Sequence, residues 1–80
     1  MKRLRERMHL AKTVLNELNR QSLSRTELEQ RTIKKAGTPA SFEGIFRYLV
    51  QDGYIKKSEA KHRANYVITE KGAKLLEAIA

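Results

Sequence analysis

Apolar residues recur at helical spacing at the start of the chain and predict a helix from about Lys2 to Asn19. The main stripe, at alternating steps of four and three residues, consists of Leu4, Met8, Ala11, Leu15 and Leu18. Leu10 and Val14 widen this stripe to about 160° of arc, which is broad for one packing surface. We interpret the face as part of the core, with the further hypothesis that Leu10 and Val14 also contact a second subunit.

A second helix is predicted from about Arg25 to Lys35, because a complete helix-start signal precedes it. Ser24 and Glu27, three residues apart, form a capping box. Leu23 and Leu28 flank the cap as the accompanying hydrophobic staple. This short helix therefore begins at a well-defined position.

The third predicted helix begins after a break in the pattern. Gly37 can close the preceding helix in the left-handed conformation, Thr38 can cap the next one, and Pro39 suits its first position. The helix ends at the Asp52-Gly53 pair. Its apolar face consists of Phe42, Ile45, Phe46, Leu49 and Val50.

The rest of the chain predicts a hairpin and a last helix. Residues 54–58 and 65–69 are β-prone, and the polar segment between them is long enough for a loop. Ile55 is expected to point inward, with either Tyr66 and Ile68 or Val67 from the second strand. Thr69 can cap a helix from Glu70 to about Ile79, with Leu75 and Leu76 on its apolar face. The predicted class is α+β, in the order helix, helix, helix, strand, strand, helix.

Two stretches give this order a likeness to a known family. "SFEGIFRYLVQDGYI" (residues 41–55) is similar to a recognition helix with an L-x-x-x-G-x-I exit, and "NYVITEKGAKLL" (residues 65–76) to a wing strand entering the last helix through T-x-x-G. From about Leu10 to Ala80 the chain resembles the winged helix-turn-helix DNA-binding domain. The likeness is greatest to small prokaryotic transcriptional regulators of the PadR and MarR kind, and to compact archaeal and archaeal-virus versions. Many of these regulators have an added sensor or dimerisation domain, which we do not expect within these 80 residues.

Composition agrees with a small domain that binds a polyanion. The 80 residues suffice for a single domain, residues 1–80, and 17 Lys and Arg against 9 Asp and Glu give a net charge of +8. The absence of cysteine excludes disulfides, thiolate metal sites and cysteine nucleophiles. With no apolar run long enough to span a bilayer and no signal peptide, we expect a cytoplasmic, nucleoid-associated protein without a membrane partner.

Nothing in the sequence predicts catalysis. His9 and His62, the two histidines, stand in no metal-ligand spacing with carboxylates, and no glycine-rich phosphate loop is present. We therefore expect neither enzymatic activity, nor a metal, nor a cofactor.

The resemblance implies that the third helix enters the major groove of DNA. With its apolar face inward, the opposite face centres on Gly44, where a missing side chain lets the backbone approach a groove closely. Arg47 can pair with guanine or a phosphate, Gln51 can pair with adenine, and Glu43 is expected to pair with Arg47. The candidate DNA contacts of this helix and its cap are Thr38, Ser41, Gly44, Arg47, Tyr48 and Gln51.

Two other basic segments are candidate DNA contacts. The hairpin offers a basic tip to the phosphate backbone or the minor groove, formed by Lys56, Lys57, Lys61, His62 and Arg63. In the resembled architecture the second helix crosses the DNA backbone, which makes Arg25 and Thr26 at its start candidate phosphate contacts. The basic N-terminal run of Lys2, Arg3, Arg5 and Arg7 is either an arm on DNA or the solvated start of the first helix.

The resemblance also predicts a homodimer on double-stranded DNA, reading half-sites about 34 Å apart. The candidate interface residues are Leu10, Val14, Leu75, Leu76 and Ile79, although the same residues suit the core. Such a protein would act as a transcriptional regulator. The alternatives are a nucleoid or replication-associated DNA-binding protein, an RNA-binding protein, or a winged-helix protein-interaction module without nucleic acid.

Overall fold

The computed structural model describes residues 4–61 and 63–79, with the backbone alone at residues 4 and 5. In these residues the elements are α1 (Leu4–Arg20), α2 (Arg25–Lys35), α3 (Pro39–Gln51), β1 (Ile55–Lys57), β2 (Tyr66–Ile68) and α4 (Glu70–Ile79). The two strands pair antiparallel as a hairpin. The described chain is therefore α+β, in the element order that the hydrophobic pattern predicts. The predicted helix start at Lys2 lies outside the described residues.

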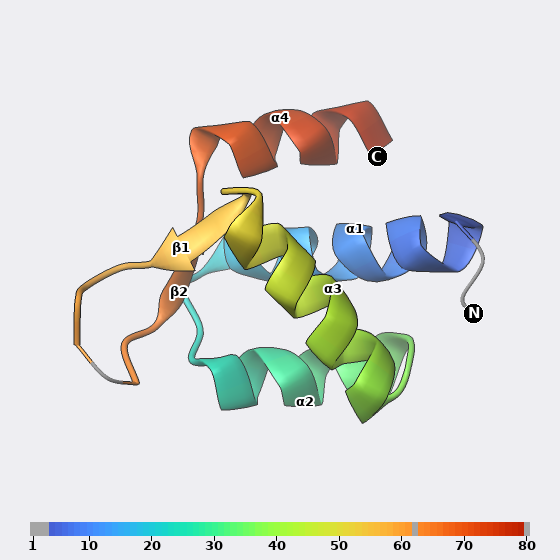
Figure 1. Cartoon of the computed structure of the whole chain (residues 1–80), viewed down its shortest axis with the longest axis horizontal. Helices are drawn as coiled ribbons and strands as arrows, with labels where there is room; N and C mark the ends of the chain where they lie inside the picture. The colour runs from blue at the N-terminus through green and yellow to red at the C-terminus, as the bar shows by residue number, and fades with distance from the viewer. Residues whose placement is uncertain (1–3, 62, 80) are drawn as a thin grey trace.

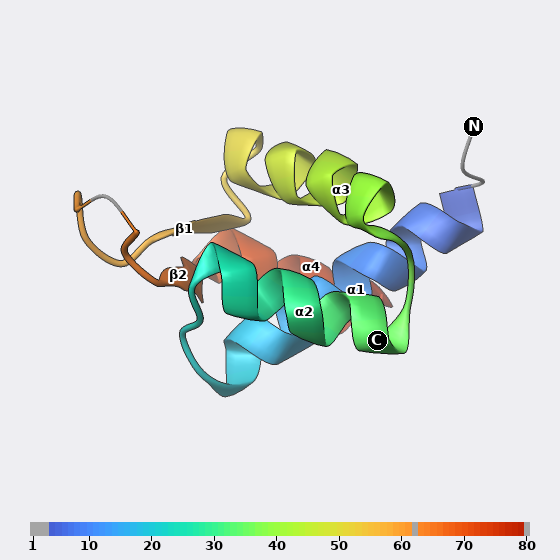
Figure 2. The same cartoon turned by 90° about the horizontal axis from the view of Figure 1, so that it is seen from below.

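Helix α1 is the central element of the fold. It packs against α2, α3, α4 and β2. Figure 1 shows α4 on one side of α1, α2 on the other and α3 crossing in front, while the hairpin projects from one end. Figure 2, seen from below, places α3 along one face of the molecule, at the top of the view, with α1 and α2 beneath it. The hairpin and the outer side of α3 are thus both accessible from outside the helical core.

The breadth of the apolar face on α1 follows from this central position. Leu10 is 3% exposed and Val14 is fully buried, so both belong to the core. The buried arc is centred on Val14, whereas Met8 at the edge of the predicted stripe is 43% exposed. The hypothesis that Leu10 and Val14 contact a second subunit is therefore wrong. A helix packed by neighbours on several sides needs a broader apolar arc than a helix with one neighbour.

Local signals define the starts of the helices as the sequence predicts. The Ser24 hydroxyl accepts a hydrogen bond from the Glu27 backbone N–H (3.2 Å), and the Glu27 carboxylate accepts one from the Ser24 N–H (3.1 Å). Gly37 has a φ of +82°, in the left-handed region. The Thr38 side chain caps α3 by accepting from the Ser41 N–H (3.2 Å). The breaks between α1, α2 and α3 are therefore encoded locally.

The hairpin is joined to the helical core at two places. Leu23 and Tyr66 exchange both backbone hydrogen bonds, at 3.2 and 2.7 Å, just before α2. The Thr69 hydroxyl donates to the Gly53 carbonyl (2.7 Å) and accepts from the Gly72 N–H (3.1 Å). A Cβ atom at Gly72 would lie 2.1 Å from the Tyr54 carbonyl oxygen, so the glycine of the T-x-x-G pattern is required by packing.

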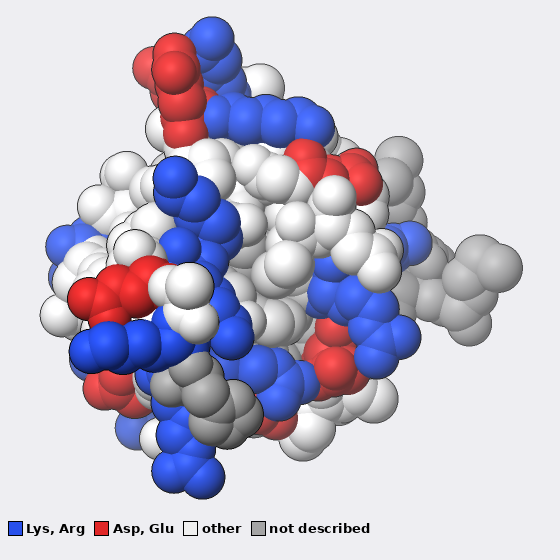
Figure 3. Space-filling model, turned by 60° about the vertical axis from the view of Figure 1, so that its left-hand side comes forward, with Lys and Arg blue, Asp and Glu red and all other residues white. Residues whose placement is uncertain are grey.

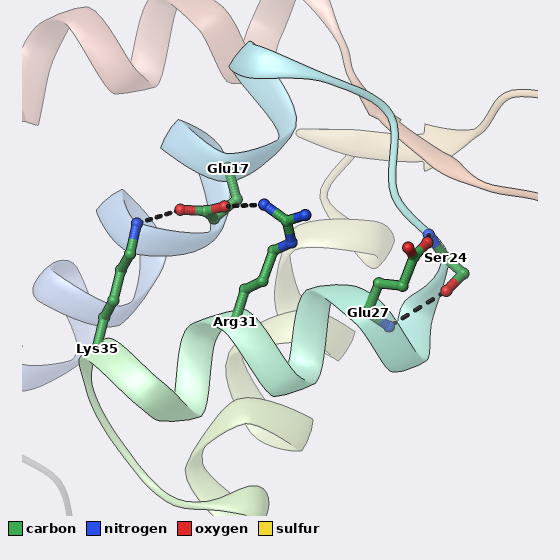
Figure 4. Close-up of polar contacts among 5 residues, drawn as sticks. All are labelled: Glu17, Ser24, Glu27, Arg31 and Lys35. Carbon is green, nitrogen blue, oxygen red and sulfur yellow. Dashed lines mark hydrogen bonds and ion pairs between the residues drawn. The ribbon is translucent and has the colours of Figure 1, made fainter.

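A buried carboxylate ties α1 to α2. The side chain of Glu17 is 3% exposed and contacts Lys35 and Arg31, two cations from α2 (Figure 4). The hydrogen bond from Lys35 is the main cause that lowers the pKa of Glu17, burial opposes it, and Arg31 adds to the lowering. The sequence pattern does signal this residue, because Glu17 lies next to Leu10 on the helical wheel, about 20° away.

Candidate nucleic-acid interface

Helix α3 presents one buried face and one open face. Phe42, Ile45, Phe46 and Leu49 are buried against the core. The opposite side carries the residues that the sequence places outward, namely Ala40, Gly44, Arg47, Tyr48 and Gln51, all of which are exposed, and Ser41, which is half-buried beside Thr38. The predicted outward orientation of this face is therefore confirmed.

Gly44 has open space around it. A Cβ atom built at this position meets nothing within 4 Å outside its own helix. Gly72, by contrast, has no room for a side chain. The packing of the protein therefore does not require a glycine at position 44, although a glycine inside a helix costs about 0.5–1 kcal/mol relative to alanine.

Val50 departs from the predicted apolar face of α3, whereas Tyr48 is exposed as predicted but packs beside neighbouring side chains. Val50, predicted to face inward, is 38% exposed, because it lies about 90° from the centre of the buried face. Tyr48 is 40% exposed, but its ring packs beside two other side chains. The ring centre lies 5.9 Å from that of Tyr54 and 6.0 Å from the guanidinium carbon of Arg7. The Tyr54 hydroxyl is the main cause that raises the pKa of Tyr48, and Asp52 adds to it.

Glu43 connects two of the candidate DNA-contacting cations. Its carboxylate pairs with Arg47 one turn along α3 (3.5 Å), as expected, and also with Arg25 at the start of α2. The Arg25 guanidinium carbon lies 5.3 Å from the centre of the Phe46 ring. Glu43 therefore orients a cation from each of the two helices and lowers the net positive charge between them.

The hairpin carries an exposed group of cations. Lys56, Lys57, Lys61 and Arg63 are all exposed, and Lys61 lies 3.6 Å from the Glu59 carboxylate. Figure 3 looks towards this end of the molecule and shows Lys and Arg side chains gathered over it, with some carboxylates among them. His62, the remaining candidate of the hairpin, lies outside the described residues, as do Lys2 and Arg3 of the N-terminal run.

A basic hollow lies between the hairpin and the start of α2. It has a volume of about 600 Å³ and is lined by Ser24, Arg25, Thr26, Lys57, Arg63, Ala64 and Tyr66. Candidate phosphate contacts from two distant segments are thus brought together. Arg63 has a φ of +66°, a left-handed conformation that an L side chain rarely adopts. The hollow brings together cationic side chains from the start of α2 and from the hairpin, and such side chains are suited to a phosphate.

The residues predicted for a dimer interface do not form one surface. Leu76 is 7% exposed and belongs to the core together with Leu10 and Val14. Leu75 and Ile79 are half-buried and line an apolar groove of about 370 Å³. The other residues that line this groove are Arg7, Met8, Ala11, Ile45 and Tyr48. The expected dimer interface is therefore wrong for the three core residues, whose side chains are already covered within the chain.

Two further observations concern other classes of site. Among the described residues, no group of three or more His, Cys, Asp and Glu side chains is placed to hold a metal ion. None of the described helices combines the length and the apolar character needed to cross a membrane.

Comparisons of the chain with protein-family models, with curated proteins and with solved structures find no match.

Proposed function

We propose that this chain is a winged-helix protein that binds double-stranded DNA in a sequence-specific manner and regulates transcription. In this proposal α3 enters the major groove, while the hairpin and the start of α2 hold the phosphate backbone. The four helices, the antiparallel hairpin and their order are compatible with a winged-helix layout. The proposal is made for the single chain, because three of the five expected dimer residues are in the core.

The observation that carries the proposal is the open space at Gly44. The centre of the exposed α3 face lacks a side chain, although nothing in the protein occupies the space where one would stand. Arg47 and Gln51 extend from the same face, one and two turns further along the helix. A helix with a bare first half and longer polar side chains after it suits the major groove, which accepts a helix and displays hydrogen-bonding base edges.

The basic hollow is the second support. Arg25, Lys57 and Arg63 surround it, so a phosphate there would meet cations from both α2 and the hairpin. Charge-assisted contacts to phosphates fix the position of a protein on the duplex without reading its sequence. The net charge of +8 favours the same partner.

The first test is the salt dependence of binding to duplex DNA. Binding through phosphates should weaken linearly in a log–log plot, with a slope of about −0.9 for each phosphate contacted. R63Q should weaken binding to all sequences alike and make the slope shallower by about one unit. K74Q removes the same charge from an exposed position on α4 and is the matched control. Failure to bind any duplex at ~50 mM salt would favour a protein-interaction module.

The second test addresses sequence preference. Selection of bound sequences from a random duplex pool should return an enriched motif for the unmodified protein. R47A should relax the preference at one position of that motif, since a bidentate arginine contact discriminates by about 1–3 kcal/mol. Equal enrichment of all sequences would favour a nucleoid-type or replication-associated DNA-binding protein, and stronger binding to RNA would contradict the proposal.

A further inference from the structure

The apolar groove, lined by Arg7, Met8, Ala11, Ile45, Tyr48, Leu75 and Ile79, lies where α1, α3 and α4 meet. Its volume of about 370 Å³ falls at the lower end of the range typical of small-molecule pockets, about 300–1,000 Å³. The groove is separate from the basic hollow, with which it shares no lining residue. Met8 remains 43% exposed beside it, although its side chain is apolar.

One cation and one phenol stand among these apolar residues. Arg7 is exposed, and within the described part of the chain it makes no ion pair with a carboxylate. Its guanidinium carbon lies 6.0 Å from the centre of the Tyr48 ring, within reach of a cation–π contact. The causes that raise the pKa of Tyr48 place its hydroxyl beside Tyr54 and Asp52, so the ring of Tyr48, and not its hydroxyl, is what it contributes to the groove. Arg7 is therefore the group of this lining that offers charged hydrogen-bond donors to an anion.

We propose that this groove binds a small amphipathic anion, with its apolar body against Met8, Ile45 and Leu75 and its anionic group on Arg7. The mixed lining argues for this class, since an apolar pocket with a few polar groups orients a ligand that has one charged end. A second copy of the chain suits the groove less well, because it would bring another net charge of +8 towards Arg7. Met8 and its flexible thioether allow the groove to adjust to different apolar bodies.

The position of the groove links it to α3. Ile45 and Tyr48 line the groove, while Gly44 and Arg47, each adjacent to one of them, belong to the exposed face. A ligand that contacts Tyr48 therefore changes the surroundings of the helix proposed to read DNA. This coupling rests on the proposed function, whereas binding of the anion does not. By linkage, the factor by which the ligand changes DNA affinity equals the factor by which DNA changes ligand affinity.

The probe we choose is octanoate, with octanamide as the uncharged analogue of the same shape. Each is titrated into the full chain without DNA and followed by backbone and methyl NMR shifts. We expect octanoate to shift the methyl signals of Met8, Ile45 and Leu75, and to bind at least tenfold more tightly than octanamide. R7Q should abolish this difference, while R20Q, a change of the same type at an exposed position on α1, should preserve it. M8E should weaken octanoate binding through repulsion, without touching a buried side chain.

Three results would overturn the proposal. They are equal binding of the two probes, an unchanged preference in R7Q, and octanoate shifts that map to the basic hollow. Shifts at the groove that depend on protein concentration in the absence of octanoate would assign it to a second copy instead. Failure to bind duplex DNA would remove the coupling and the proposed function together, yet leave anion binding to be measured independently.

Discussion

The ammonium group of Lys35 at the end of α2 is hydrogen-bonded to the carboxylate of Glu17, which is buried in α1. The two residues are 18 positions apart, and the contact fixes α2 against α1. Arg31 approaches the same carboxylate at 3.5 Å but is too far away for a short hydrogen bond. Lys35 is therefore the main partner of a charge that would otherwise be buried without compensation.

Loss of the Lys35 ammonium group should destabilise the fold more than the loss of an ordinary exposed side chain would. We expect K35M to lower the free energy of unfolding by about 1–3 kcal/mol, the range for a charged group that loses its hydrogen bond. K34M, at the neighbouring exposed position, should change it by less than about 0.5 kcal/mol. Urea denaturation of the two variants at neutral pH measures the difference. Equal stability of the two variants would mean that Arg31 alone compensates the Glu17 carboxylate.

The same carboxylate predicts a specific acid response. Since the pKa of Glu17 is lower in the folded chain than its ordinary value of 4.5, its ionised form stabilises the fold above that value. This contribution should disappear as the pH falls from that value through the folded pKa. E17Q should therefore lose less stability than the unmodified chain between about pH 5 and pH 2, whereas E77Q on α4 should follow the unmodified chain. Urea titrations at each pH test this, and parallel curves for E17Q and the unmodified chain would contradict it.

Thr32 offers a stabilising substitution. Its hydroxyl is fully buried in α2 and has no hydrogen-bond partner within the described chain. T32V keeps the shape and removes the unsatisfied group, so we expect unfolding to become harder by about 1 kcal/mol. Thermal denaturation should show a higher Tm. A lower Tm would indicate that the hydroxyl is hydrogen-bonded in solution.

Substitution of Gly44 should change the stability of the fold and the affinity for DNA in opposite directions. G44A should raise the free energy of unfolding by about 0.5–1 kcal/mol, since alanine favours a helix and meets nothing within 4 Å. The added methyl group should nevertheless weaken binding to duplex DNA, and G44L should weaken it further. Circular dichroism and fluorescence anisotropy with labelled DNA measure the two effects. Unchanged affinity in G44L would contradict a close approach of this face to a groove.

Substitution of Arg63 by glycine should also raise the stability of the fold and lower the affinity for DNA, but here the cause is the backbone conformation of Arg63. R63G should stabilise the chain by about 1 kcal/mol, because glycine adopts the left-handed conformation without the steric cost of a side chain. The same change should reduce DNA affinity by removing a cation from the basic hollow. R63K keeps both the charge and the strain, and should leave stability and affinity close to those of the unmodified chain. A gain in affinity for R63G would exclude Arg63 from the DNA contacts.

The limits of the helices could be predicted from the sequence because short-range chemistry sets them. The Ser24–Glu27 box, Gly37 and the Thr38–Pro39 pair each act within one turn, and the structure contains all three features. The outward face of α3 follows from helical periodicity in the same way.

Relationships between distant segments could not be read from periodicity. The pattern shows Leu10 and Val14 as apolar, but only the packing of α1 against its neighbours shows that they are core. Three contacts each depend on a side chain from another element. They are the pairing of Glu43 with Arg25, the buried ion pair of Glu17 with Lys35, and the contact of the Tyr48 ring with Arg7. The basic hollow likewise exists only because the hairpin folds back to the start of α2.

The paired backbone hydrogen bonds between Leu23 and Tyr66 join positions that are far apart in the sequence. The loop between them must close, at a cost in chain entropy, before these hydrogen bonds can stabilise the fold. The contact also raises the contact order of a domain that otherwise consists mainly of local helical contacts. We therefore expect the hairpin to dock late, on helices that have already assembled. Substitutions at the junction should accelerate unfolding more than they slow folding.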